Sequence, residues 1–121
     1  MIIKNVTVTI KNNSTSLKQQ SIILYKGDSG LLLTINIQGF KFKISSIGRI
    51  DATIVNKSTA KLTTIPDLRF TDDTVLLPLN EEGLILNEEG THQVQLHIYD
   101  PNFNRISTPS FDIICREPIH L

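Results

Sequence analysis

The side chains in this chain best suited to catalysis or metal binding are three histidines: His92, His97 and His120. His92 and His97 are five positions apart in a stretch that alternates like a strand. Their side chains should therefore point to opposite faces, so they cannot share a metal ion. His120 lies next to the end of the sequence. We expect no metal site built on histidine.

The single cysteine, Cys115, continues an apolar alternation that begins at Phe111 and Ile113. One cysteine cannot form a disulfide within the chain. A reactive thiolate needs a cationic or helix N-terminal environment, and Arg116 alone supplies little of this. We expect Cys115 to be a buried core thiol.

The stretch Gly27-Asp28-Ser29-Gly30 is similar to the nucleophile segment of trypsin-like proteases. That chemistry needs a histidine base, a buried carboxylate and an oxyanion hole on a scaffold of two barrels. Here all three histidines follow the serine, the reverse of the order in that family, and the chain is too short for two barrels. The stretch predicts a hairpin turn.

A short acidic repeat can be interpreted in two ways, as a functional site or as a structural feature. Asn80-Glu81-Glu82-Gly83 recurs as Asn87-Glu88-Glu89-Gly90. It could be a cation site, or two similar turns around a short apolar segment. The second interpretation is favoured because the alternating oxygen ligands of an EF-hand loop are absent.

Carboxylates elsewhere could pair for glycoside hydrolysis: Asp67, Asp72 and Asp73 with Glu81 or Glu82. Nothing in the sequence holds them at a fixed separation, and the chain has no tryptophan to stack on a sugar. We therefore expect no catalytic, cofactor-binding or metal-binding residues, and a protein that is not an enzyme.

The charge balance bears on partners. Twelve basic and twelve acidic residues give zero formal net charge, which argues against general affinity for nucleic acid or an anionic membrane. The nearest aromatic-basic alternation, Phe40-Lys41-Phe42-Lys43, is better explained as a hairpin arm within Phe40–Ile44. No signal peptide or membrane-length apolar run is visible, so we expect synthesis in a cytoplasm.

The elements that must position these residues are strands. Apolar residues alternate with polar ones in most of the chain, with no helical period. We expect a single domain, residues 1–121, folded as an all-β, immunoglobulin-like antiparallel β-sandwich of about eight or nine short strands. The strands are centred on Val6–Ile10, Ser21–Tyr25, Leu31–Gln38, Ile50–Ile54, Ala60–Thr64, Val75–Leu79, Val94–Tyr99 and Phe111–Cys115.

Polar segments between these strands predict loops. Lys11–Ser16 should be an exposed loop, and a loop should lie between Pro66 and Asp73. A short hairpin through Asn56-Lys57-Ser58 should lead to Ala60–Thr64. Pro78 should mark an edge strand or a strand end.

The last third of the chain has the clearest pattern. Val94, Leu96 and Ile98 should face the core, while His97 and Tyr99 face the other way. A polar connection from Asp100 to Pro109 should join this strand to the final one.

Two segments of this region, Glu89–Asp100 and Asn104–Pro109 followed by Phe111, resemble the N-terminal domain of phage baseplate upper proteins. Those proteins occur in tailed phages and prophages of Gram-positive bacteria. Gly27-Asp28 with the following Leu31 and Leu33 is also similar to an early strand of that family. His92 departs from the pattern, because an aromatic residue is more usual there, and Asn56–Leu79 matches only in pattern.

The resemblance implies a structural module that docks a receptor-binding or adaptor arm onto the central tail hub, without catalysis. Its partners would be other baseplate proteins, the tail hub and the receptor-binding protein, within a homo-oligomeric assembly in the virion. Phe103, Asn104 and Arg105 are the candidate interface residues, because an aromatic and an arginine on an exposed turn are common anchors. The alternative is an immunoglobulin-like adhesion or carbohydrate-binding module.

Overall fold

A computed structural model describes residues 4–12, 14–17, 22–28, 30–40, 47–71, 73–79 and 88–119. Over these ranges it contains eleven strands and no helix. The described part therefore holds no helix that could cross a membrane. The strands are β1 (Lys4–Lys11), β2 (Ser14–Leu17), β3 (Ile22–Tyr25), β4 (Leu31–Gln38), β5 (Arg49–Asn56), β6 (Leu62–Ile65), β7 (Arg69–Thr71), β8 (Thr74–Leu79), β9 (Gly90–Tyr99), β10 (Arg105–Ser107) and β11 (Phe111–Arg116).

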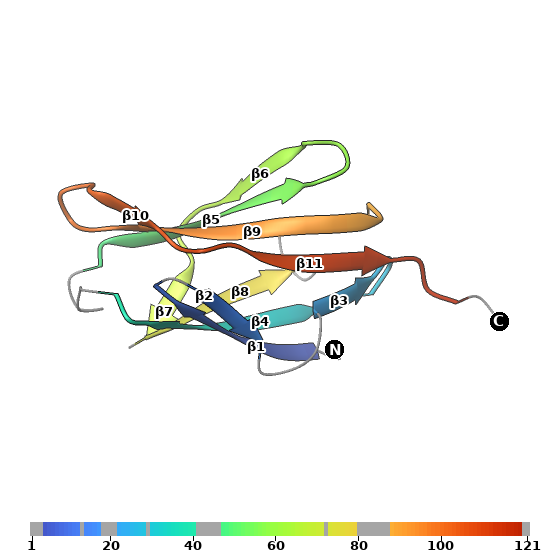
Figure 1. The fold of residues 1–121 in the computed structure, drawn as a ribbon, viewed down its shortest axis with the longest axis horizontal. Coiled ribbons are helices and arrows are strands. Elements are labelled where there is room, and N and C mark those ends of the chain that lie inside the picture. The colour runs from blue at the N-terminus through green and yellow to red at the C-terminus, as the bar shows by residue number, and fades with distance from the viewer. Residues whose placement is uncertain are drawn as a thin grey trace.

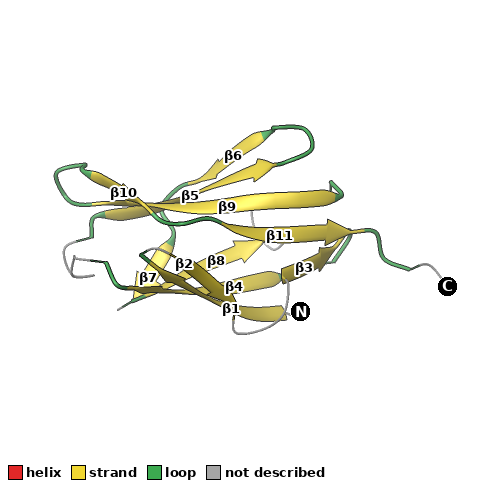
Figure 2. Cartoon of the chain, viewed as in Figure 1, coloured by secondary structure: helices red, strands yellow, loops and turns green. Residues whose placement is uncertain are grey.

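The strands form two sheets that lie one above the other (Figures 1 and 2). One sheet has the order β2-β1-β4-β8-β7. The other has the order β3-β11-β9-β5-β6, and β10 pairs with β9 beside this path. The expected all-β sandwich is thereby confirmed.

The pairing is richer than expected, since there are eleven strands rather than eight or nine. Two pairs are also parallel, β1 with β4 and β3 with β11, whereas the other pairs are antiparallel. A parallel neighbour requires a crossover between the two strands. Here β2 and β3 lie between β1 and β4 in sequence, and β3 pairs in the opposite sheet.

The core lies between the sheets and is built by alternation. Every second residue of β4 is buried, as are His92, Val94, Leu96 and Ile98 in β9. This is the period of two expected of a strand with one face inward. Burying one branched aliphatic side chain stabilises the fold by about 1.5–3 kcal/mol relative to leaving it exposed. The fully buried aliphatic residues include Val8, Ile10, Leu33, Ile35, Ile50, Val75, Leu77, Leu79, Val94, Leu96 and Ile113.

Two loop predictions are wrong. Within the expected loop Lys11–Ser16, Lys11 ends β1, and Ser14 begins β2, which pairs antiparallel with β1. The second expected loop contains β7, which pairs with β8. In both cases backbone pairing to a neighbouring strand outweighs a polar composition.

The predicted hairpin after Asn56 is confirmed, but its second strand starts at Leu62 rather than Ala60. Ala60 has a φ of 58° and belongs to the turn, a conformation that ends a strand. Pro78 is the penultimate residue of β8, beyond the residues that pair with β7. It therefore marks a strand end, as expected.

Several expectations fall outside the described residues. They are the hairpin arm after Phe40, Ser29, Asp72, most of the acidic repeat and His120. The turn after β3 is not the expected hairpin turn, because β3 pairs with β11 whereas β4 lies in the other sheet.

Candidate interface at the β9–β10 turn

The turn after β9 is organised by one carboxylate. Asp100 Oδ1 accepts the backbone N–H groups of Asn102 and Asn104, both at 2.9 Å. Its Oδ2 accepts Asn104 Nδ2 at 3.0 Å. Phe103 N–H also donates to the backbone oxygen of Asp100 at 3.0 Å. Aspartate at the first turn position and proline at the second are the residue types that favour this geometry.

These hydrogen bonds change the pKa of Asp100. They hold the pKa of Asp100 below its ordinary value, chiefly through the side-chain amide of Asn104 and then through the backbone N–H groups of Asn104 and Asn102. Because the folded pKa is lowered, the stabilisation is present above the ordinary pKa and is lost as pH falls through the lowered one. The loop is therefore best ordered near neutral pH.

We expect Asp100→Ala to loosen this turn without unfolding the sandwich, because the carboxylate is exposed. Amide exchange of Asn102 and Asn104 should become roughly tenfold faster. Asp100→Asn is the matched control, since it keeps an oxygen acceptor for the two backbone groups. Equal exchange in both variants would contradict the role given to the carboxylate.

Phe103 lies at the tip of the turn, where its side chain is 77% exposed. Its φ is 63°, in the left-handed region that bulky residues rarely adopt. Neither burial nor backbone preference therefore explains an aromatic residue at this position. A strained, exposed side chain of this kind is a reason to look for a function.

The other two candidate residues flank the end of the turn. Asn104 closes it against Asp100, and Arg105 opens β10 with an exposed side chain. The connection expected from Asp100 to Pro109 is thus shorter than predicted, because Arg105, Ile106 and Ser107 pair with the end of β9. The β9–β10 turn, which contains Phe103 and Asn104 and leads into Arg105, lies at one end of the sandwich (Figure 1).

An open pocket of about 340 Å³ lies beside the turn. Ile106, 46% exposed, lies opposite Ile98 in the β9–β10 ladder and faces this pocket. The lining residues are Ile47, Ile98, Tyr99, Asp100, Pro101, Asn102, Asn104 and Ile106. Ile47 and Ile106 could not be recognised from the sequence as pocket residues, because they are far apart in the chain and neither lies in an apolar alternation.

Gly48 allows the segment before β5 to approach the turn closely. Its N–H donates to the backbone oxygen of Tyr99 at 2.8 Å. A Cβ at this position would lie 3.2 Å from the backbone oxygen of Asp100. Such a contact is tighter than normal van der Waals packing, so a side chain here would push the turn outward.

Charged side chains lie on the outer face of the sheet that contains β5 and β9, next to the β9–β10 turn. The guanidinium of Arg49 lies over the ring of Tyr99, 4.9 Å from its centre. Arg49 Nε is 3.1 Å from Asp51 Oδ1, a charge contact without hydrogen-bonding geometry. The same oxygen accepts the N–H of Asp67 at 3.0 Å, so the buried Asp51 carboxylate ties β5 to the segment before β7.

His97 is held between two hydroxyl groups on this face. Its Nε2 lies 2.8 Å from Thr53 Oγ1, and its Nδ1 lies 2.8 Å from Ser107 Oγ. Burial lowers the pKa of His97, the nearby charge of Arg105 lowers it further, and Asp51 opposes the shift. The imidazole therefore stays neutral in the folded protein at pH 7, so it links β5, β9 and β10 as a neutral bridge.

We expect the stability of the wild type to fall relative to His97→Gln as pH drops below about 6.5, the ordinary histidine pKa. The unfolded chain takes up a proton before the folded one does, so stability rises with pH between the lowered folded pKa and that value. Urea unfolding at several pH values measures this difference. If the free energies of unfolding of the wild type and His97→Gln changed with pH by the same amount, the predicted effect of His97 would be contradicted.

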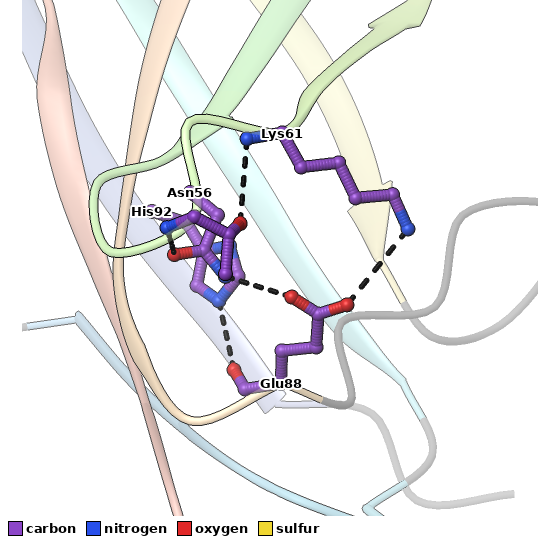
Figure 3. A network of polar contacts seen from close by, with 5 residues as sticks. Asn56, Lys61, Glu88 and His92 are labelled. Atoms are coloured by element: carbon purple, nitrogen blue, oxygen red, sulfur yellow. Dashed lines mark hydrogen bonds and ion pairs between the residues drawn. The ribbon is translucent and has the colours of Figure 1, made fainter.

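A second polar group lies at the opposite end of β9 (Figure 3). Asn56 is buried, and its Oδ1 accepts the N–H of Ser58 at 2.9 Å while its Nδ2 donates to Glu88 Oε2 at 2.9 Å. His92 Nε2 donates to the backbone oxygen of Glu88 at 2.9 Å. Lys61 Nζ lies 3.8 Å from Glu88 Oε1. This network fixes the β5–β6 hairpin against the start of β9.

Several residues considered for chemistry can be placed in the fold. His92 and His97 point to opposite faces of β9, as predicted: His92 is buried in the core and His97 lies on the outer surface. Cys115 is buried, as predicted, and burial raises the pKa of its thiol. Within the described ranges, no three His, Cys, Asp or Glu side chains are arranged to hold a metal ion.

The fold belongs to the class of two-layer β-sandwiches, and comparison with known proteins supports a relation at the level of the fold. No protein-family model and no curated protein sequence matches the chain. Among solved structures it is similar to the N-terminal domain of phage TP901-1 ORF48, with a TM-score of 0.71 and 11% identity. The match covers 95% of this chain and 100% of that domain. The resemblance drawn from the sequence is thereby confirmed at the level of the fold.

Proposed function

We propose that this chain is a single-domain structural module of a phage tail baseplate. It docks a receptor-binding or adaptor arm onto the central tail hub and performs no catalysis. It acts in the virion, after synthesis in the cytoplasm of a bacterial host. The observation that carries this proposal is the exposed, strained Phe103 at the tip of a turn, on a fold shared with a phage domain.

The order of the strands supports an immunoglobulin-like sandwich. In that fold, strands B, E and D are neighbours in one sheet, and G, F, C and C′ are neighbours in the other. Here β4-β8-β7 and β11-β9-β5-β6 have the corresponding orders. The difference lies at the start of the chain, where β1 pairs parallel with β4. Immunoglobulin-like sandwiches commonly bind through loops at one end, which is where the β9–β10 turn lies.

The chemistry of the turn suits docking to a protein. Phe103, Arg105 and Ile106 give an aromatic ring, a cation and an aliphatic side chain, all exposed, and Ile106 also lines the open pocket beside the turn. Aromatic and arginine side chains dominate the energetics of protein interfaces. The hydrogen bonds of Asp100 hold the backbone of this turn in place before binding, which lowers the entropic cost of association.

The partners that follow are other baseplate proteins, namely the tail hub and the receptor-binding protein, with further copies of this chain in the same assembly. Zero formal net charge suits close packing in such an assembly, because copies of the chain do not repel each other strongly.

The decisive experiment measures binding of Phe103→Gly to the tail hub protein and to the receptor-binding arm of the same phage, by biolayer interferometry. Loss of a central aromatic anchor should weaken binding at least about tenfold. Stability should stay unchanged or rise by up to about 1 kcal/mol, since glycine accepts the positive φ.

Leu62→Ser is the matched control, because Leu62 is also exposed but lies on β6, away from the turn. Its binding should equal that of the wild type. Wild-type protein that binds neither partner would overturn the proposal. Specific hits on a glycan array in that case would support an adhesion or carbohydrate-binding module instead.

A further inference from the structure

The outer side of β10 is an open sheet edge. β10 pairs with β9 on one side, and no described strand pairs with the other. All three of its side chains are exposed. An unpaired edge of this kind can receive another strand through backbone hydrogen bonds.

The hydrogen bonds at the two ends of β10 show which backbone groups face this edge. The oxygen of Asn104 accepts the N–H of Asp100, and the N–H of Thr108 donates to the oxygen of Leu96, both at 3.0 Å. Successive residues of an antiparallel strand alternate in direction. Ile106 therefore also points toward β9, whereas Arg105 and Ser107 direct their N–H and C=O groups to the open edge.

This short edge is complementary to itself in one register. With Ile106 opposite Ile106 of the partner subunit, Arg105 pairs with Ser107 of the partner subunit, and every outward backbone group finds a partner. A register centred on Arg105 opposes two guanidinium groups, which repel. A register centred on Ser107 puts Arg105 opposite Pro109 of the partner subunit, which has no N–H to donate.

We propose that two copies of this chain associate through antiparallel pairing of β10 with β10, centred on Ile106. The inference rests on the proposed function, which makes this end of the sandwich an interface. It adds to that function a specific partner, which is a second copy of this chain, and the register of the pairing. The two Ile106 side chains form a non-hydrogen-bonded pair, the closer kind in an antiparallel ladder. They bury each other beside the pocket that Ile47 and Ile98 line.

Such a contact is isologous, so both copies use the same three residues and the pair is closed. A strand of three residues gives weak association between free molecules. In an assembly that holds copies close together, the effective concentration reaches roughly the millimolar range, which compensates for this weakness. The pairing therefore acts as a contact between copies that a baseplate already holds near each other.

Disulfide trapping tests the register. Ile106→Cys is made in a Cys115→Ser background and oxidised mildly, beside Arg105→Cys and Leu62→Cys in the same background. Opposed Cβ atoms in the proposed pair lie about 4.5–5.5 Å apart, within reach of a disulfide. Ile106→Cys should form covalent dimers at least about tenfold faster than either control. Random collisions would instead favour Leu62, which is 62% exposed against 46% for Ile106.

Amide exchange of the unmodified chain gives a second readout. Raising the protein concentration to about 1 mM should slow exchange at Arg105 and Ser107 while leaving Ile106, already bonded to β9, unchanged. Equal trapping at all three positions, or no effect of concentration, would overturn the pairing. Trapping without hub binding would support the pairing and overturn the proposed docking; hub binding without trapping would do the reverse.

Discussion

Leu96→Ala is expected to lower the free energy of unfolding by about 2–5 kcal/mol. Leu96 lies in the middle of β9, is completely buried, and packs among the residues between the two sheets. Its truncation removes apolar contacts and leaves a cavity that the two rigid sheets cannot collapse to fill. Chemical denaturation measures the change directly, and the melting temperature should fall by roughly 3–6 °C per kcal/mol at this size.

Gln95→Ala is the control for this prediction, because Gln95 is the neighbour of Leu96 in β9 but faces outward. Its side chain makes one hydrogen bond, to the backbone oxygen of Thr108 at 2.8 Å. The loss should be about 1 kcal/mol. If both variants lost the same stability, the assignment of the inner face would be contradicted.

Thr108→Val should cost about 1–3 kcal/mol, the second large effect. Thr108 is 1% exposed and lies where the neighbour of β9 changes from β10 to β11. Its hydroxyl accepts the N–H of Leu96 at 3.2 Å and donates to the backbone oxygen of Pro109 at 3.0 Å. Valine has nearly the same shape, so its cost isolates a buried N–H left without an acceptor.

Thr108→Ser separates the hydroxyl from the methyl group, since it keeps the former and loses the latter. It should retain most of the stability that valine loses. If Thr108→Val were less destabilising than Thr108→Ser, the packing of the methyl group, rather than the hydrogen bonds of the hydroxyl, would stabilise the fold at this position. Leu96 and Thr108 are in contact, so their effects should not add in the double variant.

The sandwich could be predicted from sequence because its inner strands bury one face. Leu33, Ile35 and Ile37 alternate with polar residues, as do Val94, Leu96 and Ile98, and a period of two specifies both strand and inward face. The buried state of Cys115 followed from the same pattern. The opposite directions of His92 and His97 followed from their odd spacing.

The strands that escaped prediction lack the sustained alternation of apolar and polar residues that marks a half-buried strand. β10 is exposed at all its residues, β7 has only Phe70 partly buried, and the segment of β2 is polar in sequence. Their formation depends on backbone bonds to a neighbour, which side-chain patterns do not encode. Parallel pairing of β1 with β4 likewise depends on a crossover between sheets.

The surface position of two candidate interface residues was predicted, and their role in an interface stays a prediction. Phe103 and Arg105 stood out as anchor types in a turn, and the structure places both on the surface at one end of the sandwich. The pocket beside them was not predictable, because it joins Ile47 to Ile106 across most of the chain. The positive φ of Phe103 was also hidden, since it results from the hydrogen bonds of Asp100 and not from a glycine.

The antiparallel pairing of β9 and β11 has a mechanical consequence. The β9–β10 turn follows the last residue of β9, whereas the tail after β11 leaves beside Gly90, the first residue of β9 (Figure 1). Ten residues of strand separate these points by roughly 30 Å. Tension between a partner at the turn and one at the tail would therefore run along the continuous backbone of β10 and β11, which leads from the turn to the tail. The ladder bonds between Phe111–Cys115 and Gly90–Val94 would hold that loaded backbone against β9.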